Sequence, residues 1–214
     1  MKPPLLRFLL STLLFSFSVH CGSEEGLEAG HYYASELIDF SPGPGAGFGQ
    51  DLLPNIVLGP PDGKGPRAGG LDVLSLGQGG SITLGFGEFQ IDDETGPDFI
   101  VFENAFWVGG DSSQVFKELG RIEVSQDGDT WIAFPCDPTT HEGCAGLRPP
   151  LPYDADATIP LVPEICGGDA FDLADVGLES ARFVRIVDLS SEATAPSAGF
   201  DLDAVGIIHL NVSN

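Results

Sequence analysis

The chain has 214 residues, of which 42% are hydrophobic, 29 are glycine and 17 are proline. This length and composition favour a single domain of short strands joined by turns and argue against a protein of long helices. The 32 acidic residues and 9 basic ones give a formal charge of −23, which excludes nucleic acids and anionic lipid surfaces as favourable partners and makes cations attractive ones.

The N-terminus has the pattern of an export signal. A short basic start precedes an apolar run over residues 8–19, which is too short to span a bilayer comfortably. The sequence Ser-Val-His-Cys at 18–21 resembles the lipobox of bacterial lipoproteins, although most lipoboxes have Leu three residues before the cysteine and Gly or Ala just before it. We predict a lipoprotein signal peptide over 1–20, lipidation of Cys21, a tether over 21–30 and one domain over 31–214; an ordinary cleaved signal is the alternative.

Several segments have strand patterns. In chain order they are 31–40, 71–76, 81–86, 96–104, 181–188 and 199–210. Segment 96–104 is almost continuously apolar, so we expect it in the middle of a sheet. The Pro-rich passage 148–163 predicts an ordered surface excursion.

Residues 118–134 predict a β-hairpin. Ile122 and Val124 alternate with polar residues, and an apolar segment from Trp131 to Phe134 returns after Asp127-Gly128. Asp-Gly favours a tight turn because both central residues then take positive φ. The fold is therefore expected to be antiparallel β.

This hairpin carries a family resemblance. Val-Ser-x-Asp-Gly-x-x-Trp at 124–131 and Ala-Arg-Phe-Val-Arg-Ile at 181–186 resemble strands of discoidin-like (coagulation factor 5/8 type C) domains. Three further motifs together are similar to those of a family of bacterial cell-surface proteins: Leu-Gly-Pro-Pro-Asp-Gly at 58–63, Asp-Phe-Ile-Val-Phe-Glu-Asn at 98–104 and Gly-Phe-Asp-Leu-Asp-Ala-Val at 199–205. The resemblance implies a single antiparallel β-sandwich of jelly-roll, galactose-binding-like type, an architecture that hosts sugar, lipid and protein binders.

Calcium is the expected cofactor. It prefers six to eight hard oxygens, which carboxylates and turn carbonyls provide. In the carbohydrate-binding modules that the chain resembles, a structural calcium joins the first strand to the last, which implies Glu36 and Asp203 as ligands with Asp62 and Asp201 as helpers. In the alternative, Asp62 caps a turn and the other two aspartates are solvated.

A second acidic cluster is possible at Asp169, Asp172 and Asp175, which recur every three residues; a solvated face is the alternative. Ligand contacts are expected at Glu103, Asn104 and Trp107, because they follow a strand and lie where loops at one end of a jelly roll collect ligands. Burial of Trp107 in the core is the alternative.

Cys136 and Cys144 are expected to form a disulfide, because they bracket a short turn-rich loop in an exported protein. Pairing of Cys144 with Cys166 is the alternative.

We predict no enzymatic activity, because the chain has no Gly-x-Ser-x-Gly elbow and no His-x-x-x-His pair. The expected function is a non-catalytic, calcium-supported module of the bacterial outer membrane or cell surface that binds a glycan or another surface ligand and touches the membrane only through its lipid anchor. The rivals are a structural envelope protein and a glycoside hydrolase that uses two carboxylates.

Overall fold

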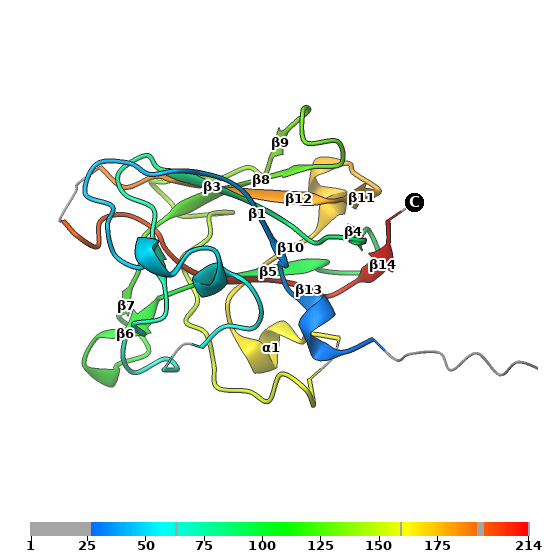
Figure 1. Cartoon of the computed structure of the whole chain (residues 1–214). Helices are drawn as coiled ribbons and strands as arrows, with labels where there is room; N and C mark the ends of the chain where they lie inside the picture. Colours follow the sequence, from blue (N-terminus) through cyan, green and yellow to red (C-terminus); the bar gives the residue numbers. More distant parts are fainter. Residues whose placement is uncertain (1–26, 63, 159, 192–194, 214) are drawn as a thin grey trace, which may run out of the picture.

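The computed structural model describes residues 27–62, 64–158, 160–191 and 195–213, and over these ranges the protein is all-β. One antiparallel sheet has the order β1 (Glu36–Ser41), β3 (Ser81–Gly85), β12 (Phe183–Asp188), β8 (Gly120–Ser125) and β9 (Ile132–Ala133). The other has the order β10 (Asp169–Phe171), β5 (Phe99–Glu103), β13 (Asp201–Ile207) and β2 (Leu74–Ser75). These sheets form two stacked layers (Figure 1), which confirms the predicted sandwich. The predicted signal peptide and Cys21 lie outside the described residues.

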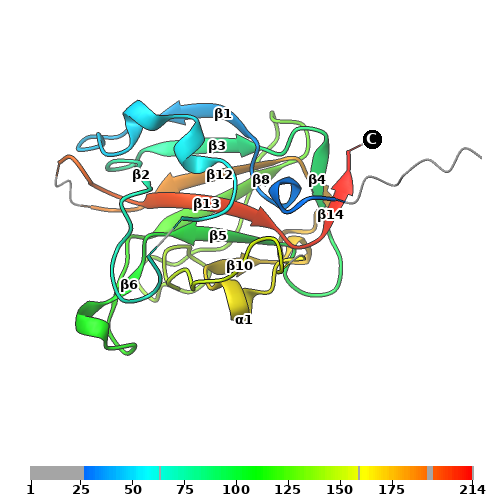
Figure 2. The same cartoon turned by 60° about the horizontal axis from the view of Figure 1, so that its bottom comes forward.

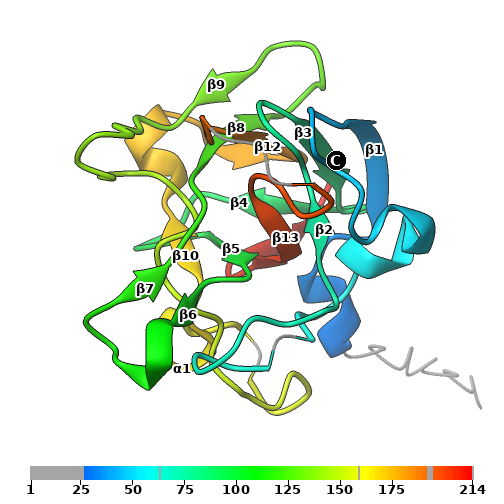
Figure 3. The same ribbon diagram turned by 90° about the vertical axis from the view of Figure 1, so that its left-hand side faces the viewer.

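Shorter elements complete the sandwich. β4 (Phe89–Asp92) pairs with β11 (Ser180–Ala181) and β14 (Leu210–Val212), and β6 (Phe106–Trp107) pairs with β7 (Val115–Phe116). The helical segments are η1 (Ala29–Tyr32), η2 (Gln50–Leu52), η3 (Asn55–Val57), η4 (Val108–Gly110), α1 (Pro163–Cys166) and η5 (Leu173–Val176). The β6–β7 pair lies at the end of the molecule opposite β14 (Figure 1), and Figure 3 looks onto that end.

β5 is the central strand predicted from its apolar run. All five of its residues are buried, and it lies between β10 and β13 (Figure 2). A strand that is covered on both faces needs apolar side chains on both, which explains why its sequence does not alternate. A buried acid lies at each end of β5: Asp98 directly precedes the strand, and Glu103 is its last residue.

The predicted hairpin is present, but its turn is longer than two residues. β8 and β9 pair Glu123 with Ala133 and Val124 with Ile132, which leaves a loop over residues 126–131. Gly128 has a φ of 81°, whereas Asp127 does not enter the left-handed region. The carboxylate of Asp127 instead accepts the backbone N–H groups of the next residues in the loop. The side-chain bonds of an aspartate, rather than a two-residue turn, therefore shape this connection.

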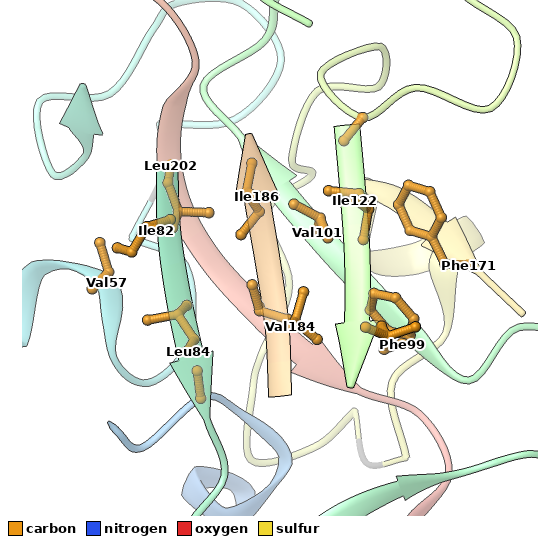
Figure 4. Packing of buried hydrophobic residues seen from close by; sticks show 14 of the residues in the cluster. Val57, Ile82, Leu84, Phe99, Val101, Ile122, Phe171, Val184, Ile186 and Leu202 are labelled. Atoms are coloured by element: carbon orange, nitrogen blue, oxygen red, sulfur yellow. The ribbon is translucent and has the colours of Figure 1, made fainter. Parts of the chain in front are cut away.

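The main core lies between the two sheets. Val184 and Ile186 of β12 point inward, as their alternation predicts, and both are fully buried. They pack with Val101 and Leu202 of the facing sheet (Figure 4). Each such side chain contributes roughly 1.5–3 kcal/mol through removal of apolar surface from water.

A second core covers the outer face of the four-stranded sheet. Ile100, Phe102 and Ala204 pack there with Leu161 and Tyr153. The last two belong to the Pro-rich passage 148–163, whose described part lies with α1 next to β10 (Figure 2). This sheet is therefore buried on both faces.

The first strand begins later than its sequence pattern predicts. Residues 31–32 belong to the 3-10 helix η1, and β1 starts at Glu36. The backbone N–H of Ala34 donates to the carbonyl of Val205 in one sheet, while β1 pairs with β3 in the other. The chain thus crosses from one layer to the other before β1 begins. Ile38 lies at a bulge in the pairing with β3.

Candidate functional site

Three aspartates gather where β4, β5 and β10 meet. Asp93 follows β4, Asp98 precedes β5, and Asp172 follows β10. β10 and β5 run antiparallel and pair Phe171 with Phe99. Asp172, which follows Phe171, therefore lies beside Asp98, which precedes Phe99. One carboxylate oxygen from each of the three lies within 4.8 Å of the others, a property of no other group of three His, Cys, Asp or Glu side chains in the described ranges. We name these three residues the Asp93 group.

Asp98 is the fixed member of the Asp93 group. Its buried carboxylate accepts the backbone N–H of Glu94 at 3.0 Å and that of Leu173 at 2.7 Å. The Nδ1 atom of His209 lies 2.7 Å from the same carboxylate. These bonds connect the loop before β5, the segment after β10 and the end of β13. Asp98 therefore supplies a carboxylate oxygen in a fixed position, and Asp93 and Asp172 approach it from other segments.

The charges of the Asp93 group are not balanced by one another. The pKa of Asp93 is raised, first by desolvation and then by repulsion from Asp98 and Asp172. Asp172 also caps η5, because its carboxylate accepts the backbone N–H of Ala174 at 2.9 Å. Carboxylate oxygens in close contact on a turn-rich edge are the donor set of a hard cation such as calcium. The Asp93 group is thus the arrangement in the described structure that best fits the predicted cofactor.

The four residues assigned to calcium by resemblance do not form such a group. Asp203 accepts the backbone N–H of Asp62 at 3.1 Å, so these two do meet. Asp201 accepts the hydroxyl of Ser75, and Glu36 lies on β1 of the opposite sheet, where it pairs with Gly85. Ahead of β1, the backbone N–H of Ala34 donates to the carbonyl of Val205 in β13.

The predicted acidic cluster divides into separate places. Asp172 joins the Asp93 group, while Asp169 accepts the backbone N–H groups of Gly146 and Leu147, each at 2.8 Å. Asp175 is exposed. Because β10 alternates and then enters η5, a spacing of three does not place these carboxylates on one face.

The predicted ligand residues have mainly structural surroundings. Glu103 is 1% exposed, and the side chain of Asn104 accepts the N–H of Gly70 and donates to its carbonyl. Trp107 is half-buried in β6, and its backbone N–H donates to the carbonyl of Pro66 at 2.7 Å. They do not present one exposed surface.

A pocket that the sequence did not predict lies beside the disulfide loop. The predicted Cys136–Cys144 disulfide is present, and Cys166 is a free, buried thiol whose pKa is raised by burial. We name the hollow next to the Cys136–Cys144 disulfide the disulfide pocket. Its lining includes apolar and charged side chains: Phe134, Leu147, Phe171, Glu142, Arg148, Asp169 and Asp175.

Asp169 is the buried polar group of the disulfide pocket. Burial raises its pKa to about 6, and the N–H donors of residues 146–148 oppose that rise. Arg148 is exposed at the pocket and adds a small favourable charge. Apolar walls with a few fixed polar groups are typical of small-molecule sites.

Two of the three residues in the Asp93 group were absent from the sequence-based site. Asp93 and Asp98 flank a Gly-Pro turn before the most apolar strand of the chain, and acids that bracket such a turn were the available signal. Their meeting with Asp172 depends on the pairing of β10 with β5, which only the fold establishes.

No family model matches the chain, and no curated protein matches it either. The discoidin-like resemblance stays a prediction. In the part of the chain that the structure describes, the helices are all too short or too polar to cross a membrane.

Proposed function

We propose that the protein is an exported, non-catalytic binding domain of the bacterial cell envelope, in which calcium at the Asp93 group supports ligand binding in the disulfide pocket. One observation carries this proposal: the segment 169–175 contributes to both places. Asp172 belongs to the Asp93 group, and Asp169, Phe171 and Asp175 line the disulfide pocket.

Calcium would act on the pocket through this shared segment. The carboxylate oxygens of the Asp93 group lie within 4.8 Å of one another, and a counter-ion between them would relieve the repulsion between their charges. A bound calcium would attract the carboxylate of Asp172 and the fixed carboxylate of Asp98 at the same time, and so would hold these two groups together. Because Asp172 directly follows Phe171, the ion would hold the pocket wall in place.

The expected ligand is a glycan or another polar surface ligand with an apolar face. The disulfide pocket offers Phe134 and Phe171 for apolar contact and Arg148 for hydrogen bonding. Sugars present both kinds of surface, since their C–H faces pack on aromatic rings and their hydroxyl groups bond to charged side chains. The jelly-roll type suggested by the discoidin-like motifs is compatible with this class of ligand.

The proposed location at the cell envelope follows from the N-terminal sequence and is supported by the disulfide. A basic start, a short apolar run and Cys21 predict a lipid-anchored protein of the outer membrane or cell surface. Cys136 and Cys144 form a disulfide. Disulfides persist in oxidising compartments such as those outside the cytoplasm, which agrees with export. The lipid anchor is the expected contact with the membrane.

A glycan array in the presence of calcium or of EGTA tests the proposal. We expect calcium-dependent binding by the wild-type chain, loss of that dependence in Asp172→Asn, and loss of binding in Arg148→Ala with calcium binding retained. Asp156→Asn is the matched control, because Asp156 is an exposed acid away from both places. Absence of binding under all conditions would favour a structural envelope protein and contradict the proposal.

A glycoside hydrolase is the second candidate, and Asp169 favours it. A buried carboxyl whose pKa is raised to about 6 is suited to proton donation near neutral pH, and Glu142 and Asp175 line the same pocket. Incubation of the array hits with the protein, followed by analysis of the released sugars, separates the two functions. Turnover that disappears in Asp169→Asn would replace the binding module by the enzyme.

A further inference from the structure

We propose that the outer face of the five-stranded sheet binds the carboxylate groups of an acidic polysaccharide through Arg121, Arg182 and Arg185. We name these three residues, together with Trp131 and Phe183, the arginine face. None of the five lines the disulfide pocket or belongs to the Asp93 group, so this surface is separate from the calcium-supported site. The inference therefore goes beyond the proposed function.

The arginine face lies on the solvent side of the sheet. The buried core residues of β12 and β8 alternate with residues that face away from the core. Phe183 and Arg185 of β12 and Arg121 of β8 occupy these outward positions, and all three are partly exposed. Figure 1 shows this sheet as the upper layer of the molecule, with β9 above it. Side chains on this face can thus meet a ligand from solution.

Two of the arginines are held in fixed positions by one glutamate. Glu123 pairs with Arg185 across β8 and β12, and its carboxylate accepts a hydrogen bond from Nη1 of Arg185 at 3.3 Å. The Nε and Nη2 atoms of Arg121 donate to the same carboxylate at 3.1 and 2.8 Å. Arg185 also donates to Thr83 at 3.2 Å, and its guanidinium carbon lies 3.6 Å from the ring centre of Trp131. Two cations thus share one anion, and each guanidinium keeps N–H donors for a further acceptor.

The third arginine, Arg182, makes no ion pair in the part of the chain that the structure describes. Its Nε atom is buried there without a hydrogen-bond partner. Its guanidinium carbon lies 5.7 Å from the ring centre of Phe183. A folded protein rarely leaves such a donor unbonded, and this chain has 32 acidic residues that could pair with it. An arginine that stays unpaired despite this excess of acids points to an anion from outside the chain.

The loop between β8 and β9 joins the two ends of the arginine face. A Cβ atom placed on Gly128 of this loop would lie 3.6 Å from the ring of Phe183. The Nε1 atom of Trp131 donates to the carbonyl of the same glycine at 3.1 Å. The two aromatic rings therefore border one residue, and each has an arginine over it. Arginine and aromatic side chains form one continuous surface.

The spacing of the arginines favours a sparsely charged ligand. Arg182 and Arg185 are three residues apart, which is roughly 10 Å at about 3.3 Å per residue, and Arg121 pairs with Val187, roughly 7 Å further along β12. Duplex DNA carries one charge per about 1.7 Å of its axis, and the net negative charge of this chain repels so dense a polyanion. A chain of uronic acids has one carboxylate on each sugar ring, and the C–H faces of the rings pack on aromatic side chains. This alternation of charged and apolar groups matches that of the arginine face.

Acids border the arginine face without occupying it. The carboxylate of Asp127 in the β8–β9 loop accepts the backbone N–H groups of Asp129 and Thr130. Glu36 and Asp39 belong to β1, which lies two strands from β12, or roughly 10 Å. At physiological ionic strength, exposed charges beyond about 8 Å are largely screened, so a bound carboxylate responds mainly to the arginines. Guanidinium groups bind carboxylates through two parallel hydrogen bonds, which are stronger than bonds between neutral groups.

Tryptophan fluorescence tests this proposal. The chain has two tryptophans, and Trp107→Phe, carried by every protein in the test, leaves Trp131 as the only one. The full chain, produced with its export signal and purified in detergent, is titrated with an oligogalacturonate in EDTA; the fully methyl-esterified oligomer is the uncharged control ligand. We expect the acid to change the emission of Trp131 and the ester to leave it unchanged. Arg182→Gln should weaken binding about tenfold, as the loss of one charged hydrogen bond predicts, whereas Arg67→Gln, at an exposed arginine before β2, should not.

The absence of calcium separates this test from that of the proposed function. Asp172→Asn should bind the oligogalacturonate as its parent does. Absence of binding in EDTA would overturn the arginine face and leave the calcium-dependent function intact. Binding that is lost in Arg148→Gln and kept in Arg182→Gln would assign the ligand to the disulfide pocket instead.

Two further controls test the chemistry of the ligand. Equal binding of acid and ester would show that the carboxylates are not recognised, and equal binding of single-stranded DNA would show a general affinity for polyanions; either result would overturn the proposal. If Arg182→Gln fails to fold by circular dichroism, Arg121→Gln replaces it, because the side chain of Arg121 is 40% exposed.

Discussion

Asp98 and Glu103 lie at the two ends of β5, and their buried carboxyl groups have opposite surroundings. Asp98 accepts the N–H groups of Glu94 and Leu173 and contacts His209. Glu103 has no hydrogen-bond partner among the described residues. One strand therefore carries a carboxylate that the fold satisfies and another that it leaves unsatisfied.

This difference predicts opposite effects of neutral substitutions in the absence of metal. Asp98→Ala removes the acceptor of the buried N–H of Leu173 and of the partly buried N–H of Glu94, and should lower the free energy of unfolding by about 1–3 kcal/mol. Glu103→Gln removes a buried carboxyl group whose pKa is raised by burial and by repulsion from neighbouring acids, and should leave the free energy of unfolding unchanged or raise it. Urea unfolding in EDTA measures both. Equal losses in the two variants would show that Glu103 has a stabilising partner.

Calcium should raise the melting temperature through the Asp93 group. At a calcium concentration a hundred times the dissociation constant, binding to the folded state alone raises the free energy of unfolding by about 2.7 kcal/mol. In a domain of this size, each kcal/mol raises the melting temperature by roughly 2–4 °C. Asp172→Asn should reduce the increase seen on replacing EDTA with calcium. Glu36→Gln is the matched control, because Glu36 lies on β1 of the opposite sheet. A full response in Asp172→Asn, with none in Glu36→Gln, would restore the set implied by resemblance.

Asp169 should make stability depend on pH. Burial raises its pKa in the folded state from 3.8 to about 6, so folding favours its protonated form. Stability from this group is present below its unfolded pKa and is lost as the pH rises toward about 6. The shift of about two units corresponds to about 3 kcal/mol. The free energy of unfolding of the wild type, minus that of Asp169→Asn, should fall between pH 4 and pH 7. Parallel curves for the two proteins would contradict the burial of a charged Asp169.

The disulfide should stabilise both the fold and the disulfide pocket. Cys136 and Cys144 are separated by eight positions, and closing so short a loop restricts the unfolded chain by about 2–3 kcal/mol in the chain-entropy account. The double variant Cys136→Ser/Cys144→Ser should lose about that much and bind array ligands more weakly. Non-reducing peptide mapping of the wild type should find Cys166 as a free thiol. A Cys144–Cys166 peptide would contradict the pairing.

Cys21→Ala should release the protein from the membrane fraction. The prediction follows from the apolar run that ends just before Cys21, and cell fractionation with mass spectrometry of the mature N-terminus checks it. Retention in the membrane with unchanged processing would contradict lipidation.

Much of the fold was predictable because its strands have strong local patterns. β5, β8 and β12 were expected from apolar runs or alternation, and each is present. The start of β1 was wrong, because Tyr33 and Ala34 bond to the strand of one sheet before the chain joins the other. No local pattern indicates such a crossing.

The candidate site was predictable only in part. Asp172 was identified as an acid in a cluster, but spacing along the chain assigned it the wrong neighbours. Its companions, Asp93 and Asp98, are brought close by the pairing of β10 with β5. The isolation of Glu103 was equally hidden, because a sequence shows which group is charged and not whether a hydrogen-bond donor lies opposite it.

The edge strand β1 determines how neighbouring copies can meet. An open strand edge is a template for pairing with another chain. Here the edge carries Glu36 and Asp39, and the bulge at Ile38 interrupts its regular row of backbone groups. In the proposed anchored state, where molecules share one plane and collide often, like charges and an irregular edge oppose sheet-to-sheet joining. The protein can then be crowded on a surface and still remain a set of separate molecules.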